Sequence, residues 1–311
     1  MSFSSDVKKE ICLLINNDFK KAACLYGMLL FSNQFEDNGI TFNTEHPEAS
    51  ALFLNCLEDV IGIDALNFVK TSETHKRNST VLYTSAIREH KCIEKIKRFY
   101  NIEGNTFRKM RGENFSDNVS AFICGVFLAA GTVTDPNKEY HLEYITQDFE
   151  LCNDFAQLMQ EQADINLKIM ERKGTYVLYS KGSESIEDNF TLMGATQSSL
   201  EIMNIKILKD VRNKTNRIAN CDTANIEKTI KASVIQVEDI EYIITMKGID
   251  YLSDDLQEIA MLRLENPECS LRELGTMLTK SIGRSGVNHR MKKIAEIAQE
   301  IRNEMTEDYN V

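Results

Sequence analysis

The sequence predicts an α+β protein, in which a duplicated αβαββα domain with pseudo-twofold symmetry precedes an all-helical domain. The first observation is a repeated helical pattern, because Ala23 and Gly27 are matched 98 residues later by Ala121 and Gly125. The second is that the same order of helices and strands follows each copy. The third is that the last third of the chain shows only helical periodicity. A repeat of this kind is considered before other features, since it decides the architecture.

Each repeated helix carries small residues four positions apart. Residues separated by four positions lie on one face of a helix, so small side chains there allow another backbone to approach closely. The second copy extends the pattern to Ala129. We therefore predict that the two halves pack through Ala23 and Gly27 of one helix and Ala121 and Gly125 of the other. Two unrelated buried helices are the alternative.

The segments that follow the two helices are similar in order. A polar N-terminus comes first, in which Ser4 or Ser5 is expected to cap a helix. The first half then predicts strands or extended runs at 39–44, 66–71 and 80–86, and helices at 48–60 and 89–100. The second half predicts strands at 140–146, 166–172 and 175–180, a helix at 148–162 and a helix from about Ser185.

The second central helix contains Ile-Cys-Gly-Val-Phe-Leu-Ala-Ala-Gly at 123–131, which resembles the signature of LAGLIDADG homing endonucleases. The resemblance implies a nuclease centre with a metal-binding carboxylate near the end of each central helix. The aligned positions hold Ser32 and Ala130, which cannot bind Mg²⁺ as a carboxylate does. The nearest acids, Glu36, Asp37 and Asp135, are expected past the helix ends. We therefore predict a degenerate scaffold without catalytic residues, with a metal-dependent endonuclease as the alternative.

The last third predicts helices at 226–246 and 256–265, then a short helix opened by a capping box of Ser270 and Glu273. A turn at 279–284 and a long helix capped by Ser285 follow. The apolar residues of the long helix recur at helical spacing: Val287, Met291, Ile294, Ala298 and Ile301.

The opposite face of this last helix is polar and basic. Asparagine can bind adenine through two hydrogen bonds, and lysine and arginine can reach guanine or phosphate. A helix N-terminus also favours a phosphate. The sequence therefore predicts a recognition helix for DNA, with these DNA-binding residues: Ser281, Arg284, Ser285, Asn288, His289, Arg290, Lys292 and Lys293.

The sequence of residues 285–293, Ser-Gly-Val-Asn-His-Arg-Met-Lys-Lys, resembles the helix-turn-helix of the WhiA family. That motif is similar to domain four of sigma factors. The resemblance covers nearly the whole chain and implies a sequence-specific, non-enzymatic DNA-binding protein of cell division, chromosome segregation or sporulation. It implies LAGLIDADG-like halves at 1–105 and 106–212, a linker at 213–225 and a helix-turn-helix domain at 226–311, with its motif at about 270–302. The expected partners are double-stranded DNA and another transcription factor or RNA polymerase, in a cytoplasmic, nucleoid-associated protein.

The net charge of −11 argues against indiscriminate binding to nucleic acid. Basic residues are nevertheless concentrated in three segments, 85–111, 204–217 and 270–302. The middle segment supplies predicted secondary DNA contacts: Lys206, Lys209, Arg212, Lys214 and Arg217. A capped linker, whose amides satisfy loop backbone groups, is an equal alternative for this segment.

Other ligand classes find no support in the sequence. The five histidines lack metal-ligand spacing, and we expect no metal, no cofactor and no small-molecule substrate. The chain has no apolar run of membrane-spanning length. An RNA-binding or protein-binding scaffold stays open as a further alternative, although no aromatic stacking motif favours RNA.

Overall fold

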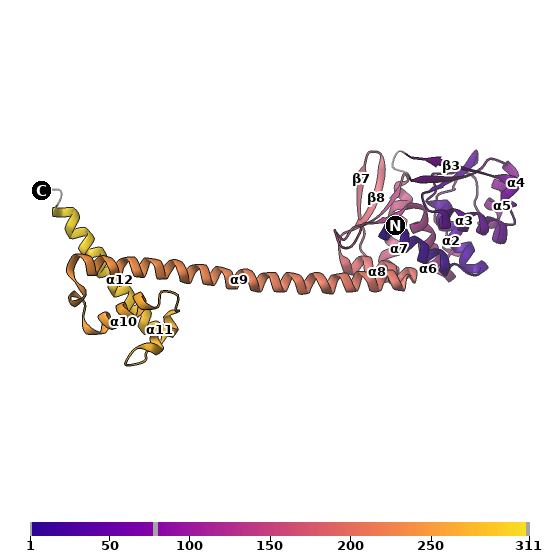
Figure 1. Ribbon diagram of the computed structural model, residues 1–311. Helices are drawn as coiled ribbons and strands as arrows, with labels where there is room; N and C mark the ends of the chain where they lie inside the picture. The colour runs from indigo at the N-terminus through magenta and orange to yellow at the C-terminus, as the bar shows by residue number, and fades with distance from the viewer. Residues whose placement is uncertain (1, 77–79, 309–311) are drawn as a thin grey trace. The chain divides into compact units, whose positions relative to one another are not determined.

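The computed structural model describes residues 2–76 and 80–308. The chain forms two compact units, Met1–Asp210 and Val211–Val311, and each is described by itself. The first unit is α+β and the second is helical, which confirms the predicted fold class (Figure 1).

The first unit contains the same succession of elements twice. The first copy consists of α2 (Asp18–Leu30), β1 (Gln34–Glu36), β2 (Gly39–Thr44), α3 (Pro47–Cys56), a π-helical turn (Leu57–Ile61), α4 (Ala65–Phe68), β3 (Val69–His75), β4 (Val81–Ile87) and α5 (His90–Phe99). Two 3₁₀ turns (Gly112–Asn114 and Ser116–Asn118) lead into the second copy. That copy consists of α6 (Val119–Ala130), β5 (Gly131–Val133), β6 (Leu142–Thr146), α7 (Phe149–Ala163), β7 (Lys168–Arg172), β8 (Thr175–Ser180) and α8 (Ser183–Met193).

The two halves form separate antiparallel sheets of identical topology. The strand order is β1-β2-β4-β3 in one sheet and β5-β6-β8-β7 in the other. Equivalent pairs have equivalent register, since Thr44 pairs with Tyr83 in the first sheet and Thr146 with Tyr176 in the second. The duplication predicted from the sequence is therefore present in the fold.

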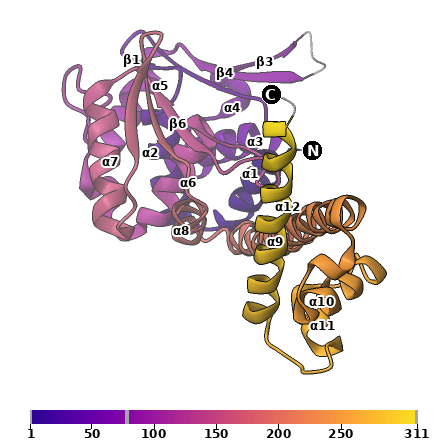
Figure 2. The same ribbon diagram turned by 90° about the vertical axis from the view of Figure 1, so that its left-hand side faces the viewer.

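Helices α2 and α6 pack against each other in the core of this unit (Figures 1 and 2). A Cβ atom at Gly27 would lie 2.4 Å from the carbonyl oxygen of Phe122, and one at Gly125 only 2.0 Å from that of Cys24. The obstacles are backbone atoms, which cannot rotate away as a side chain can. Ala23 lies in the same buried face, at 2% exposure, and Ala121 is 4% exposed.

Three local predictions for this unit were wrong. Helix α1 (Phe3–Leu14) is capped by Ser2, whose hydroxyl accepts a hydrogen bond from the Ser5 amide, and not by Ser4 or Ser5. The strand predicted at 66–71 begins as the short helix α4, because the Asp64 carboxylate caps it. The short strands β1 and β5 were not predicted, so the second half has the order αββαββα, and the first half has the same order with the short helix α4 added.

The second unit is built on helices. Helix α9 (Thr196–Lys247) runs for 52 residues and continues into this unit. It is followed by a 3₁₀ turn (Ile249–Tyr251), α10 (Asp254–Glu265), α11 (Leu271–Met277) and α12 (Arg284–Asp308). Residues 213–225 are helical throughout, so the loop expected in a capped linker is absent there. The core of the unit is formed by the following buried side chains: Ile240, Ile243, Leu252, Leu256, Ile259, Ala260, Leu274, Leu278, Val287, Met291, Ile294, Ala298 and Ile301.

Candidate functional site

Helices α11 and α12 are joined by a turn whose shape depends on close backbone packing. The Ile282 amide donates a hydrogen bond to the Gly275 carbonyl at 3.0 Å. A Cβ atom at Gly275 would lie 2.3 Å from the Ile282 carbonyl oxygen, so only glycine fits this helical position without a shift. The start of α11 is fixed by the predicted capping box, in which Ser270 and Glu273 exchange hydrogen bonds of 2.7 and 3.3 Å.

Helix α10 supports this motif through two side chains. Arg263 is 1% exposed, and its guanidinium donates to the Cys269 carbonyl at 2.7 Å and to the Pro267 carbonyl at 3.3 Å. It therefore closes the loop between α10 and α11. The Glu258 carboxylate accepts a hydrogen bond from the Thr279 amide at 2.6 Å, and this bond lowers the pKa of Glu258. Both contacts hold the turn in place.

Helix α12 buries its apolar stripe and exposes the predicted binding face. All five residues of the predicted stripe are buried. The exposed members of the predicted DNA-binding set are Ser281, Arg284, Ser285, Asn288, His289, Lys292 and Lys293. Ser281 lies in the turn, and the others follow one another over the first three turns of the helix.

Two details of this helix differ from the sequence prediction. The helix begins at Arg284, and the Gly283 carbonyl accepts hydrogen bonds from the amides of Gly286 and Val287. Ser285 therefore lies inside the first turn and is not the N-cap. The Arg290 side chain is only 20% exposed and pairs with Asp255 of α10, at 3.4 Å to its carboxylate and 3.3 Å to its carbonyl. The Arg290 guanidinium therefore lies on the flank of α12 and connects this helix to α10.

The basic residues predicted as secondary contacts on α9 fall into two groups. Lys206 pairs with Glu184 at 2.8 Å, and Lys209 donates to the Pro136 carbonyl at 2.6 Å and lies over the Tyr140 ring. These two side chains fasten α9 to the rest of the first unit. Arg212, Lys214 and Arg217 are exposed on α9 beyond these contacts.

The ends of the two central helices lack the carboxylates of a nuclease. Ser32 lies just beyond α2 and is 5% exposed, and its hydroxyl donates to the carbonyl of Leu29 at 2.7 Å or to that of Gln34 at 3.0 Å. Ala130 is the last residue of α6. Among residues 2–76 and 80–308, no group of three or more potential metal-ligating His, Cys, Asp or Glu side chains comes together. The two positions therefore offer a buried hydroxyl and a methyl group.

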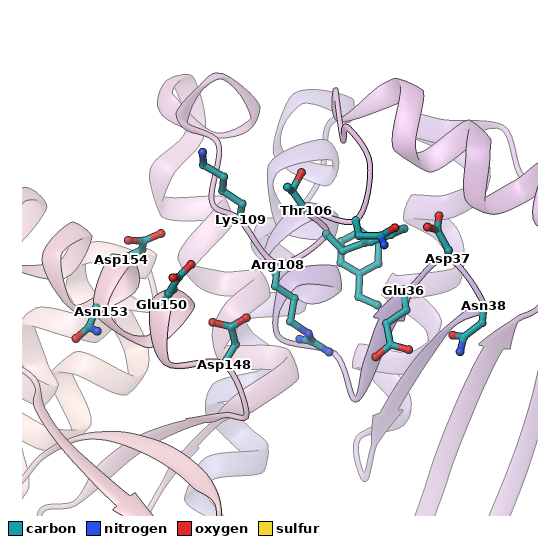
Figure 3. A pocket seen from close by; sticks show the side chains of 13 residues that line it. Glu36, Asp37, Asn38, Thr106, Arg108, Lys109, Asp148, Glu150, Asn153 and Asp154 are labelled. Carbon is teal, nitrogen blue, oxygen red and sulfur yellow. The ribbon is translucent and has the colours of Figure 1, made fainter.

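The acids near these helix ends take part in local contacts. Asp37 pairs with Lys97 at 2.8 Å. Asp135 is partly exposed in a turn, where hydrogen bonds from the Asn137 amide and side chain lower its pKa. Glu36 lies at the edge of an open cavity of about 1040 Å³, together with Arg108 and Asp148 (Figure 3). None of these acids stands in a pair at the helix ends.

Sequence reasoning missed Gly275 and Arg263, the two residues that shape the helix-turn-helix core. A glycine inside a helix costs about 1 kcal/mol relative to alanine, so Gly275 did carry a signal of close packing. Arg263 lies at helical spacing from the buried Ile259 and Ala260, but arginine is ordinarily an exposed residue, so its residue type gave no signal of burial. In the described residues, no helix is both long and apolar enough to cross a bilayer.

The fold and these sites define a class of protein: a LAGLIDADG-like domain without its nuclease carboxylates, joined to a helix-turn-helix domain. The chain matches the model of the WhiA LAGLIDADG-like domain over residues 119–212 and that of the WhiA C-terminal HTH domain over residues 215–298. The chain belongs to the WhiA family.

Individual relatives agree over the full length. The chain is 37% identical to the "Probable cell division protein WhiA" of Clostridium beijerinckii, covering 97% of this chain and 99% of that protein. It is 36% identical to the protein of the same name from Thermoanaerobacter pseudethanolicus, covering 97% and 98%. The crystal structure of full-length WhiA from Thermatoga maritima aligns with a TM-score of 0.57 at 25% identity, covering 96% of this chain and 99% of that one.

Proposed function

We propose that this chain is a sequence-specific, double-stranded DNA-binding regulator and that it has no nuclease activity. In this proposal α12 enters the major groove, with Asn288 and His289 nearest the bases. Arg284, Lys292 and Lys293 contact phosphate or add to base recognition. The names of its relatives support a role in cell division. In this proposal the role is exercised through transcription, and chromosome segregation and sporulation are the related processes.

The observation that carries this proposal is the division of α12 into two faces. Val287, Met291 and Ile294 are buried in the core of the unit, so the opposite face has a fixed orientation. That face exposes an amide, an imidazole and two ammonium groups within two turns. A rigid helix with donors and acceptors in its first turns meets the requirement for reading base edges in the major groove.

The experiment begins with selection of bound duplexes from a random pool by the full chain. Asn288→Ala should then weaken binding to the selected site by ~1–3 kcal/mol and relax its sequence preference. Lys293→Ala should weaken all duplexes similarly and reduce the slope of log affinity against log salt by about one. The two variants therefore separate base recognition from phosphate contact.

Matched controls come from exposed residues outside the proposed face. Gln299→Ala removes an amide from a later turn of α12, and Lys231→Ala removes an ammonium group from α9. Both should bind the selected site as the unchanged protein does. If Asn288→Ala, His289→Ala and Lys292→Ala all preserve affinity and preference, the recognition helix is wrongly assigned. The basic segments at 85–111 and 204–217 would then be tested next.

We propose further that Arg212, Lys214 and Arg217 of α9 add phosphate contacts, because they are exposed. Lys206 and Lys209 make intramolecular contacts and should contribute less. Replacing the first three residues together by alanine should lower the salt dependence of binding, whereas Lys206→Ala should not. An unchanged salt slope in the triple variant would remove α9 from the interface.

A protein partner, either another transcription factor or RNA polymerase, is also part of the proposal, as is association with the nucleoid. Exposed apolar side chains on α9 support it, since Ile218, Ile226 and Ile230 are each more than half exposed. Ile226→Asp should weaken co-sedimentation with purified RNA polymerase while leaving DNA affinity unchanged. If the variant and the unchanged protein co-sediment equally with RNA polymerase, the exposed apolar residues of α9 do not form the contact surface.

A further inference from the structure

Two cationic side chains bind the C-terminal ends of the paired central helices. The Lys8 ammonium donates a hydrogen bond to the Leu128 carbonyl of α6 at 3.3 Å. The Arg108 guanidinium donates to the Leu30 carbonyl of α2 at 2.5 Å and to the Ser32 carbonyl at 2.9 Å. Leu30 and Leu128 occupy the same position of the repeat, 98 residues apart. The two contacts are therefore equivalent under the duplication.

The contacts are also reciprocal. Lys8 belongs to α1, which precedes α2 in the chain, yet it binds the end of α6. Arg108 belongs to the segment that precedes α6, yet it binds the end of α2. Each cation therefore connects the segment that precedes one central helix to the C-terminal end of the other central helix. The same kind of contact between the two halves occurs in both copies of the repeat. This favours a common structural role over coincidence.

The surroundings of the two cations are alike. Glu45 is near Lys8, and the following turn is closed by a hydrogen bond of 3.2 Å from the His46 amide to the Thr44 hydroxyl. Asp148 is near Arg108, and its own amide donates to the Thr146 hydroxyl at the same distance of 3.2 Å. Figure 3 shows Arg108 with Asp148 on one side and Glu36 on the other.

The physical basis is the unsatisfied carbonyl groups at a helix C-terminus. These groups carry partial negative charge, and a cation near them gains an attraction that offsets part of the cost of burying its charge. Lys8 is 6% exposed, and its ammonium also lies 5.6 Å from the centre of the Phe127 ring. Arg108 contacts Ser32 itself, and Lys8 contacts Leu128, two residues before Ala130. Ser32 and Ala130 are the positions where the LAGLIDADG signature would require a metal-binding carboxylate.

We propose that Lys8 and Arg108 are built-in cations that hold each half to the end of the other half's central helix, in the place that metal ions would occupy in a catalytic relative. They are positioning residues, and they make the domain a scaffold that is complete without a metal. This inference concerns the first unit alone and does not depend on DNA binding by α12.

The first test measures where protection from amide hydrogen exchange is lost in the full chain. Lys8→Met should raise exchange at least tenfold at residues 128–131, at the end of α6. Arg108→Met should do the same at residues 30–33, at the end of α2. Arg108→Lys should retain part of the protection, because it keeps the charge. The effect is expected in the half opposite to the substituted residue.

Matched controls use cations of the same segments that make other contacts. Lys9 of α1 pairs with the exposed Glu48, and Arg111 donates to the Thr106 and Lys109 carbonyls of its own loop. Lys9→Met and Arg111→Met should leave both helix ends protected. Loss of protection only around the substituted residue, or equally throughout the unit, would overturn the proposal.

The second test restores the carboxylates with Ser32→Asp and Ala130→Asp. In the otherwise unchanged protein, the new carboxylates should pair with Arg108 and Lys8 and leave added Mn²⁺ free in its electron paramagnetic resonance spectrum. With Lys8→Met and Arg108→Met added, the same carboxylates should bind Mn²⁺. Binding in both backgrounds, or in neither, would overturn the assignment of the two cations to the place of metal ions.

Discussion

The central helix α6 and the helix α12 both carry apolar residues at helical spacing, but they bury different fractions of their surface. In α6 every residue from Ala121 to Leu128 is buried. In α12 the buried residues recur only every three or four positions, as at Val287, Met291 and Ile294. A helix that is apolar all round belongs to a core, whereas one with a polar face meets solvent or a ligand. The outward positions of a helix therefore indicate function better than its buried stripe does.

The positive charges of the two regions also differ in their exposure to solvent. The cations near the central helices, Lys8 and Arg108, point into the first unit and bind backbone carbonyls. The cations of α12, Lys292 and Lys293, are exposed. In one region the positive charge is hydrogen-bonded to backbone carbonyl groups inside the fold, and in the other it is exposed to solvent. Charge counts along the sequence do not distinguish these two uses.

The largest expected effect concerns the contact of α2 with α6. Gly27→Leu and Gly125→Leu each place a side chain against backbone of the facing helix, so the free energy of unfolding should fall by ~3 kcal/mol or more, at the upper end of overpacking effects. Chemical denaturation measures this. Gly112→Leu is the control, because open space surrounds that position. Unchanged stability in both central variants would remove the distinction between α6, as a fully buried helix, and α12, as a helix with one exposed face.

Much of the fold was predictable because its long elements have clear periodicity. The predicted runs at 39–44 and 175–180 coincide with β2 and β8. The three-residue strands β1 and β5 are too short for a periodic signal, and they exist through pairing with β2 and β6. The amide-rich residues 213–225 suggested a linker through their resemblance to the corresponding junction of WhiA proteins, yet the helix continues through them with every side chain exposed.

The candidate site was predictable in part. The exposed face of α12 follows from the spacing of its apolar residues alone. Once these residues are placed in the core, the residues on the opposite side of the helix must face outward. The pairing of Arg290 with Asp255 did not follow, because it depends on how α10 packs against α12. Similarly, the capping box of Ser270 is local and was predicted, whereas the contact of Gly275 with Ile282 is set by the tertiary turn.

A smaller effect, of about 1 kcal/mol, concerns the pH dependence of the buried cation. Burial lowers the pKa of Lys8 to about 8 from 10.5, with Cys12, Glu45 and His46 as its charged or titratable neighbours. Between these pKa values the unfolded chain binds the additional proton, so this group adds stability as pH rises. From pH 7.5 to 9 the gain should be about 1 kcal/mol.

The measurement compares the unchanged protein with Lys8→Met at each pH, so that other titrations cancel. Cys12, whose pKa burial raises to about 12, contributes to both proteins. The difference in unfolding free energy should move in favour of the unchanged protein with rising pH. A difference that is constant from pH 7.5 to 9 would show that Lys8 titrates normally and is open to water.

A still smaller effect is expected for the partly exposed pair of Arg290 and Asp255. Such pairs contribute up to about 1 kcal/mol. Asp255→Asn should therefore lower stability slightly, and it should leave DNA sequence preference intact because Asp255 lies on α10. Arg290→Gln should match it in thermal stability. If Arg290→Gln instead changes base preference as strongly as Asn288→Ala, Arg290 belongs to the recognition surface rather than to the support of α12.

No effect at all is expected when divalent metal is added to the protein with DNA. The hydroxyl of Ser32 is hydrogen-bonded within its own turn, and Ala130 has no ligand atom. Asp135 is the acid nearest in sequence to the end of α6, but its carboxylate accepts hydrogen bonds from the Asn137 amide and side chain. Supercoiled plasmid incubated with Mg²⁺ or Mn²⁺ should therefore stay supercoiled, beside a parallel reaction with an active nuclease. Nicking that persists through purification and disappears in Asp135→Asn would show that the first unit kept a catalytic acid, and the contrast between a scaffold and a binding helix would no longer hold.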